Sequence, residues 1–267
     1  MRSLVQLAAL CTISLLSIDP VLANSEGADR ESRGLGPTPD NYVGGRGLIT
    51  QEGPTGMFLN PTSGTLRQGS LVTQYCVWFT AVADNHRTTH GVLATYGVTD
   101  WLETGAYGQF IDGLGTAVGN DYVDAAQASV RIRLLRDKGG VPELSVGAFT
   151  QHGNDIQRKD TIYVAASKFI PLGDPTIIRG IRLHAGFRQL WQRGDEGSIF
   201  YGGAEIGLGY DLYLVGEVST RDNFYTEMPW SAGLQYRRPD GFGLSFAVTQ
   251  TGFASELASY VGIGVNF

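Results

Sequence analysis

The sequence lacks the features that mark several common classes of protein. It has only two cysteines among 267 residues, and Cys11 lies in an N-terminal segment that we expect to be removed, which leaves Cys76. One cysteine cannot form an internal disulfide or a cysteine-rich metal site. Beyond the N-terminal segment, no stretch approaches the ~18 consecutive apolar residues that a transmembrane helix requires. The formal net charge of −6 argues against nucleic acid as a partner, because nucleic-acid binding needs a basic surface.

The N-terminus has the pattern of a signal peptide, predicted over residues 1–23. Arg2 supplies a positive start, residues 4–18 are mostly apolar, and residues 21–23 give a small-residue cleavage pattern. Residues 24–68 are predicted to be a periplasmic N-terminal segment. Its first part is polar and aperiodic, which predicts disorder. Its second part, from Gly47, carries turns and apolar anchors, and we expect it to lie against the following domain or inside it.

The last eleven residues, 257–267, alternate with a period of two. Every odd position except Ser259 is apolar, and the even positions are small, polar or amphipathic. This pattern predicts a strand with one face in an apolar medium. The segment resembles the closing strand of bacterial outer-membrane β-barrels, which implies an assembly signal for the outer-membrane assembly machinery. The residues of that signal are Val261, Ile263, Val265 and Phe267.

From Ser70 onward the same alternation recurs in segments of about ten residues separated by turn clusters. The predicted strands are 70–82, 89–98, 101–111, 122–134, 142–151, 161–171, 180–190, 198–208, 211–220, 229–237, 242–250 and 257–267. Tight turns alternate with longer polar connections, as expected for periplasmic turns and external loops. The sequence therefore predicts an all-β fold, a transmembrane antiparallel β-barrel of about twelve strands and outer-membrane type, over residues 69–267.

The charged residues inside the predicted strands fall almost wholly on one face. A charge on the lipid face costs ~2–4 kcal/mol at the bilayer midplane, so this face is predicted to line the lumen. The predicted basic residues are Arg131, Arg133, Lys168, Arg182, Arg188, Arg221 and Arg237, and the carboxylates are Glu103, Glu143, Glu205 and Glu217. Two interpretations follow: the charges pair across the lumen and close it, or they line a channel that weakly prefers anions.

Two stretches carry a family resemblance. The first contains Gly47-Leu48-Ile49, Pro54-Thr55-Gly56, Asn60-Pro61-Thr62 and Gly64-Thr65-Leu66, and the second contains Gly202-Gly203-Ala204-Glu205, Leu214-Val215-Gly216-Glu217 and residues 232–237. Both are similar to segments of YjbH-like outer-membrane barrels. The resemblance implies a barrel associated with exopolysaccharide production and export.

The four histidines, His86, His90, His152 and His184, show no metal-binding spacing, and no cofactor is expected. We therefore expect a non-enzymatic outer-membrane protein, either a narrow porin-like channel or an envelope component that accompanies polysaccharide export. The alternatives are an outer-membrane hydrolase of phospholipase or protease type, and a structural or adhesive barrel. The expected partners are outer-membrane lipid, the assembly machinery, and polysaccharide or small anions.

Overall fold

A computed structural model gives the architecture of the chain. It describes residues 56–82, 85–112, 125–153, 158–172, 178–192, 194–208, 211–223, 225–238, 241–252 and 257–267. The predicted signal peptide and the N-terminal segment up to residue 55 lie outside the described residues. Among the described residues, no helix is long and apolar enough to cross a membrane.

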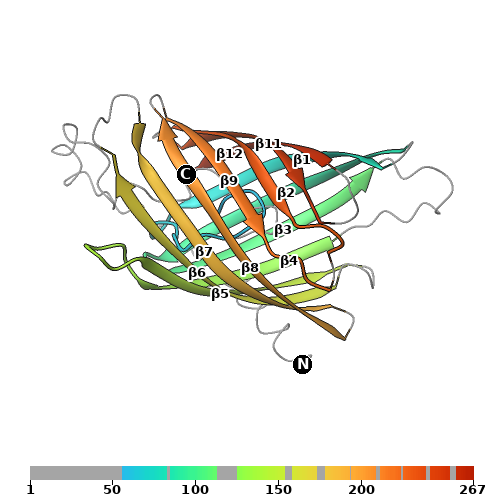
Figure 1. Cartoon of the computed structure of the whole chain (residues 1–267), viewed down its shortest axis with the longest axis horizontal. Helices are drawn as coiled ribbons and strands as arrows, with labels where there is room; N and C mark the ends of the chain where they lie inside the picture. Colours follow the sequence, from blue (N-terminus) through green and yellow to red (C-terminus); the bar gives the residue numbers. More distant parts are fainter. Residues whose placement is uncertain are drawn as a thin grey trace.

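The described chain folds into twelve strands that form one closed barrel (Figure 1). They are β1 (Leu71–Val82), β2 (Asn85–Thr99), β3 (Leu102–Asp112), β4 (Ala125–Leu135), β5 (Glu143–His152), β6 (Lys159–Pro171), β7 (Ile178–Gln192), β8 (Asp195–Leu208), β9 (Leu212–Ser219), β10 (Trp230–Arg237), β11 (Phe242–Gln250) and β12 (Leu257–Asn266). Each strand pairs antiparallel with the next, and β12 pairs with β1 from Val72↔Asn266 to Thr80↔Ala258. Closure leaves no strand edge with unpaired backbone groups. The predicted twelve-stranded antiparallel barrel is confirmed.

The two ends of the barrel differ in the connections that they carry. The turn end carries the connections from β2 to β3, β4 to β5 and β10 to β11, together with the start of β1 and the end of β12; the loop end is the opposite one. Three register shifts, at residues 97–99, 133–135 and 178–180, all fall at the turn end. Bulges of this kind bend a strand and increase its twist. The strand pairing is therefore irregular at the turn end, where residues 67–70 lead into β1.

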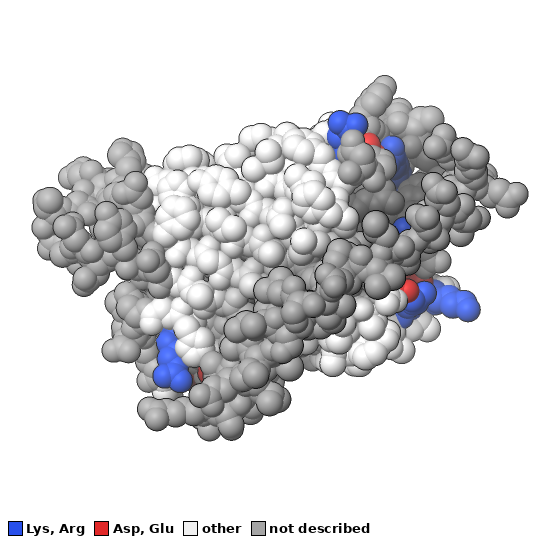
Figure 2. Space-filling model, turned by 180° about the vertical axis from the view of Figure 1, so that it is seen from behind, with Lys and Arg blue, Asp and Glu red and all other residues white. Residues whose placement is uncertain are grey.

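The outward residues of the strands form an apolar belt. Its exposed members include Phe79, Val92, Val130, Ile162, Leu183, Phe200, Leu214, Leu234, Phe246 and Ile263. Charged side chains at described outward strand positions lie near strand ends: Lys168 and Arg179 at the turn end, Asp160 and Glu196 at the loop end. Figure 2 shows one face of the molecule, on which charged side chains gather toward the two ends and leave the middle uncharged. An exterior of this kind matches the hydrocarbon layer of a membrane.

Residues 56–66, named the strap from here on, lie inside the ring of strands (Figure 1). Met57, Phe58 and Leu66 of the strap are buried in a cluster with wall residues. The wall members of this cluster are Val72, Cys76, Trp78, Leu93, Tyr107, Tyr201, Val215, Ala247 and Tyr260. The apolar core of the barrel is therefore shared between the wall and the strap, and this packing holds residues 56–66 in the lumen.

Candidate functional site in the lumen

The strap crosses the lumen from β9 to β3 and is buried along its whole length. It makes a tight turn at its start, where the Met57 N–H donates to the Asn60 carbonyl at 3.1 Å and Gly56 bridges to Pro61. A glycine on the facing wall makes room for this turn, since a Cβ at Gly203 would collide with the Met57 sulfur. The strap carries no charged side chain, so its backbone and small polar groups supply its contacts with the charged wall.

Glu217 on β9 holds the turn of the strap. Its Oε1 accepts the N–H groups of Phe58 at 2.9 Å and Leu59 at 2.6 Å, and its Oε2 accepts the Asn60 N–H at 3.0 Å. The Asn60 side-chain amide adds a fourth donor at 2.8 Å. The Ser231 hydroxyl also donates to this carboxylate. Charge-assisted hydrogen bonds of this kind are about twice as strong as neutral ones, so Glu217 is the strongest single anchor of the strap.

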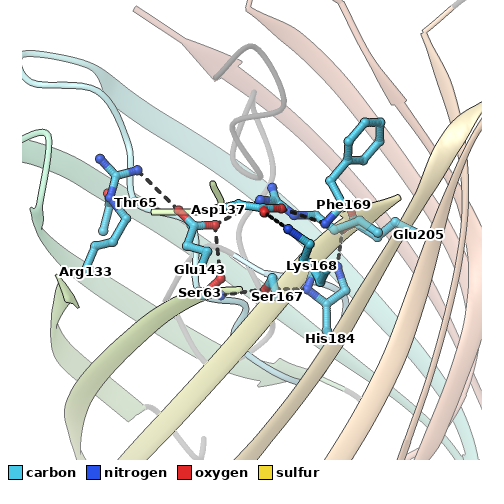
Figure 3. A network of polar contacts seen from close by, with 12 residues as sticks. Ser63, Thr65, Arg133, Asp137, Glu143, Ser167, Lys168, Phe169, His184 and Glu205 are labelled. Atoms are coloured by element: carbon cyan, nitrogen blue, oxygen red, sulfur yellow. Dashed lines mark hydrogen bonds and ion pairs between the residues drawn. The ribbon is translucent and has the colours of Figure 1, made fainter. Parts of the chain in front are cut away.

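The middle of the strap is held from four further strands. The Tyr201 hydroxyl of β8 donates to the Pro61 carbonyl at 2.9 Å. Ser63 donates its N–H to Ser167 Oγ on β6 at 3.3 Å and its hydroxyl to Glu143 Oε2 on β5 at 3.1 Å (Figure 3). Arg131 of β4 donates to the Gly64 carbonyl. These contacts satisfy backbone groups of the strap that would otherwise be buried without partners.

The strap leaves the lumen at the turn end. The Leu66 N–H donates to Glu103 Oε2 on β3 at 3.0 Å. The Thr65 hydroxyl donates to the Asp100 carbonyl at 2.8 Å, and the Gln68 N–H donates to the Asp100 carboxylate at 3.0 Å. Asp100 lies in the turn between β2 and β3, so that turn fixes where the strap passes into β1.

The structure places nine of the predicted lumenal charges on the inner wall. Arg131 pairs with Glu103 at 3.4 Å, and Glu143 receives both Arg133 at 3.3 Å and Arg182 at 3.0 Å. Arg237 donates to both oxygens of Glu205, at 3.1 and 2.8 Å. Glu217 binds the strap, and Arg188 lies over the Tyr201 ring at 5.9 Å. Three of the four carboxylates, Glu103, Glu143 and Glu205, therefore pair with arginines, as one of the two interpretations expected. Glu103, Glu143 and Glu217 hold the strap.

Two predicted lumenal residues lie elsewhere. Lys168 has outward parity on β6, because Ser167 and Phe169 are the buried neighbours, and its ammonium reaches Asp137 in the β4–β5 turn at 2.5 Å. A lysine near a strand end can extend its charge to the rim, which makes an outward position tolerable. Arg221 lies beyond the end of β9, is exposed and donates to the Thr226 carbonyl. The prediction that these two residues line the lumen is wrong.

His184 stands between Ser167 and Glu205 (Figure 3). Its Nδ1 lies 2.8 Å from Ser167 Oγ, and its Nε2 lies 3.8 Å from Glu205 Oε1. These are the residue types of a hydrolase triad. However, the Ser63 N–H of the strap occupies the serine oxygen, and Arg237 binds both oxygens of the glutamate. Among the described residues, no group of three or more His, Cys, Asp or Glu is placed to hold a metal ion.

The closing strand carries the predicted assembly residues on its outer side. Val261 and Ile263 are exposed there, and Phe267 is 74% exposed beyond the last strand residue. Sequence reasoning gave the outward parity of these residues and nine of the eleven lumenal charges, but not the route of the strap. The available signal was the absence of charge from residues 56–66, next to a wall rich in charge.

Comparisons with known proteins identify the architecture. No protein-family model matches the chain, and no curated protein matches it. A KdgM porin solved in complex with disordered oligogalacturonate superposes with a TM-score of 0.53 at 11% identity, over 74% of this chain and 99% of the porin. A NanC porin gives 0.52 at 12% identity, over 72% and 98%. The COG4313 outer membrane channel from Pseudomonas putida F1 gives 0.50 at 10% identity, over 76% and 97%. The chain therefore has the fold of outer-membrane porins and channels.

Proposed function

We propose that this chain is a non-enzymatic, porin-like barrel of the bacterial outer membrane whose lumen is closed by the strap and conducts when the strap is displaced. The apolar belt supports the membrane location. The observation that carries the proposal is the strap itself, which crosses the lumen from β9 to β3 with every residue buried. A strap without charges, held by side chains of the wall, is a removable closure rather than part of the sheet.

The arrangement around Ser167 does not favour a hydrolase. Ser167 and His184 are buried, and the strap donates a hydrogen bond to the hydroxyl that would act as nucleophile. A nucleophile must be reachable by its substrate. The contacts of Ser167 therefore support a role in holding the strap against the wall.

Locking the strap to the wall tests the proposal. Ser63→Cys and Ser167→Cys, combined with Cys76→Ala, place one thiol on the strap and one on the wall at two residues in direct contact, since the Ser63 N–H donates to the Ser167 oxygen at 3.3 Å. Refolded protein in planar bilayers should show no conductance when oxidised and recover it on reduction. Ser63→Cys with Cys76→Ala alone should conduct equally in both conditions. Equal conductance of the double-cysteine protein before and after reduction, with the disulfide verified, contradicts a moving strap.

The solute is proposed to be a small anion or an anionic saccharide. Five arginines of the described strands lie on the inner wall, and basic side chains in a lumen favour anions. The related fold of a porin solved with oligogalacturonate supports a saccharide, as does the resemblance to YjbH-like barrels associated with polysaccharide export. Cells that carry the oxidised, locked barrel should then export less polysaccharide than cells with the single-cysteine control. Unchanged export would remove polysaccharide from the proposal.

The outer-membrane assembly machinery is proposed as the partner of the closing strand, because Phe267 follows β12 as an exposed aromatic residue and Val261 and Ile263 are exposed on the same strand. Deletion of Phe267 should lower the amount of assembled barrel, measured as the fraction that changes its gel position on boiling. Asn266→Ala at the neighbouring position should leave that fraction unchanged. Equal assembly of the two variants would show that the terminal aromatic residue is incidental.

A further inference from the structure

The turn of the strap surrounds a carboxylate with backbone donors. The N–H groups of Phe58, Leu59 and Asn60 are consecutive in the chain, and all three point at Glu217. The Asn60 side-chain amide completes the set, so that each carboxylate oxygen receives two donors from the strap. Successive backbone N–H groups that converge in this way form a concave anion-binding site, called a nest.

Glu217 differs from the other lumenal carboxylates in how its charge is balanced. Glu103, Glu143 and Glu205 each pair with an arginine. Among the described residues, no cation pairs with Glu217, which is bound only by the four donors of the nest and the Ser231 hydroxyl. A buried charge is tolerated only where hydrogen bonds or an opposite charge compensate it. The nest therefore compensates a carboxylate by itself, with no help from a neighbouring arginine.

We propose that residues 58–60 of the strap form a carboxylate-binding site that Glu217 occupies in the closed barrel and that a soluble carboxylate can occupy in its place. This inference rests on the proposed function, in which the strap closes the lumen. A solute carboxylate in the nest removes the strongest anchor of the strap and leaves Glu217 without its donors. Carboxylate solutes thus shift the strap toward its displaced state, whereas chloride does not.

The class of ligand follows from the donor set. Two donors meet each of two oxygens, which matches the planar carboxylate group. The wall beside the turn is close, because Met57 leaves no room for a Cβ at Gly203. The site therefore fits the carboxylate of a small acid or of an acidic sugar at the end of a chain.

Chemical rescue tests the site through the position of the strap, independently of conductance. Leu59→Cys with Cys76→Ala provides a reporter thiol in the nest that a membrane-impermeant reagent labels only when the strap is displaced. Adding Glu217→Ala to this background removes the carboxylate and should raise the labelling rate about ten-fold or more, because charge-assisted hydrogen bonds are lost. Acetate should then lower the rate again by filling the vacated space, while sodium chloride at the same ionic strength should not.

The protein with Glu217 intact should respond in the opposite direction. In the Leu59→Cys, Cys76→Ala background, acetate competes with Glu217 and should raise the labelling rate. This measurement needs no change at Glu217, so it tests the carboxylate-binding site even if Glu217→Ala fails to assemble. Ser63→Cys with Cys76→Ala, used in place of Leu59→Cys, is the second reporter, because its thiol lies in the strap outside the nest.

A matched control separates the nest from a general loss of lumenal charge. Glu205→Gln removes a buried carboxylate that binds Arg237 and lies outside the nest. Acetate should not slow labelling in this variant. Acetate-insensitive labelling with Glu217→Ala and with Glu217 intact overturns the nest and leaves the channel proposal standing. A strap that responds to acetate in a barrel that never conducts overturns the channel proposal and leaves the nest standing.

Discussion

The outer and inner faces of the barrel come from the same strands and differ in the partners that their side chains contact. The outer face meets lipid, so each outward residue is selected for one property, the absence of charge away from the rims. The inner face meets the strap, so its residues are matched to individual groups, such as Glu217 to three consecutive N–H groups. Lipid therefore constrains only the composition of the outer face, whereas a lumenal segment requires specific hydrogen-bonded pairs of residues.

The largest expected effect on the outer face comes from a charge at mid-depth. Val164 lies outward in the middle of β6 and is exposed. Val164→Arg should lower the free energy of unfolding by ~2–4 kcal/mol, because the guanidinium would lie in hydrocarbon near the midplane. Urea titration of the barrel in lipid vesicles measures this loss.

The same strand supplies the depth control. Ile170 is also outward and exposed, but it lies near the turn end beside the region where Lys168 already reaches Asp137. Ile170→Arg should cost only about 0–1 kcal/mol, since charges near the interface reach water. Equal costs at the two positions would mean that no bilayer surrounds the belt.

The contrast between the faces also decides what the sequence predicts. Alternation with a period of two identifies the strands and their outer faces, since lipid acts on every outward residue in the same way. The inner charges Arg131, Glu143 and Glu217 follow from the same parity. Lys168 does not, because its neighbours Ser167 and Phe169 give no clear alternation and only the local register shows which side it takes.

The strap is less predictable than the wall. Its contacts join residues that are 35 to 159 positions apart, as in Thr65 to Asp100 and Phe58 to Glu217. No local pattern encodes such pairs, because the partner of each N–H is set by where the closed barrel brings the wall. The sequence indicates turns and apolar anchors near residue 60, and those features fit a location inside the barrel or against it equally well.

The smallest expected effect concerns the ion preference of a barrel without its strap. Among the described residues, five arginines and four carboxylates lie on the inner wall away from the loop end, where the inward charges of Lys159 and Asp195 cancel. Subtraction leaves one net positive charge. A chain that begins at residue 67 should therefore conduct small anions slightly better than cations. The preference should fade as salt rises, because the screening length falls from about 10 Å at 0.1 M to about 3 Å at 1 M.

Substitution of two lumenal arginines tests this balance. Arg182→Gln with Arg188→Gln leaves three arginines against the four carboxylates, and the reversal potential in a salt gradient should change sign toward cations. Arg136→Gln removes one positive charge from the exposed β4–β5 turn and should leave the reversal potential unchanged, since that side chain is 63% exposed outside the lumen. Cation preference in the strapless parent, unaltered by the double substitution, would mean that these arginines do not face the path of the ions. The inner face would then be a seat for the strap alone, and the conducting route would have to run along a part of the wall that carries none of the nine charges.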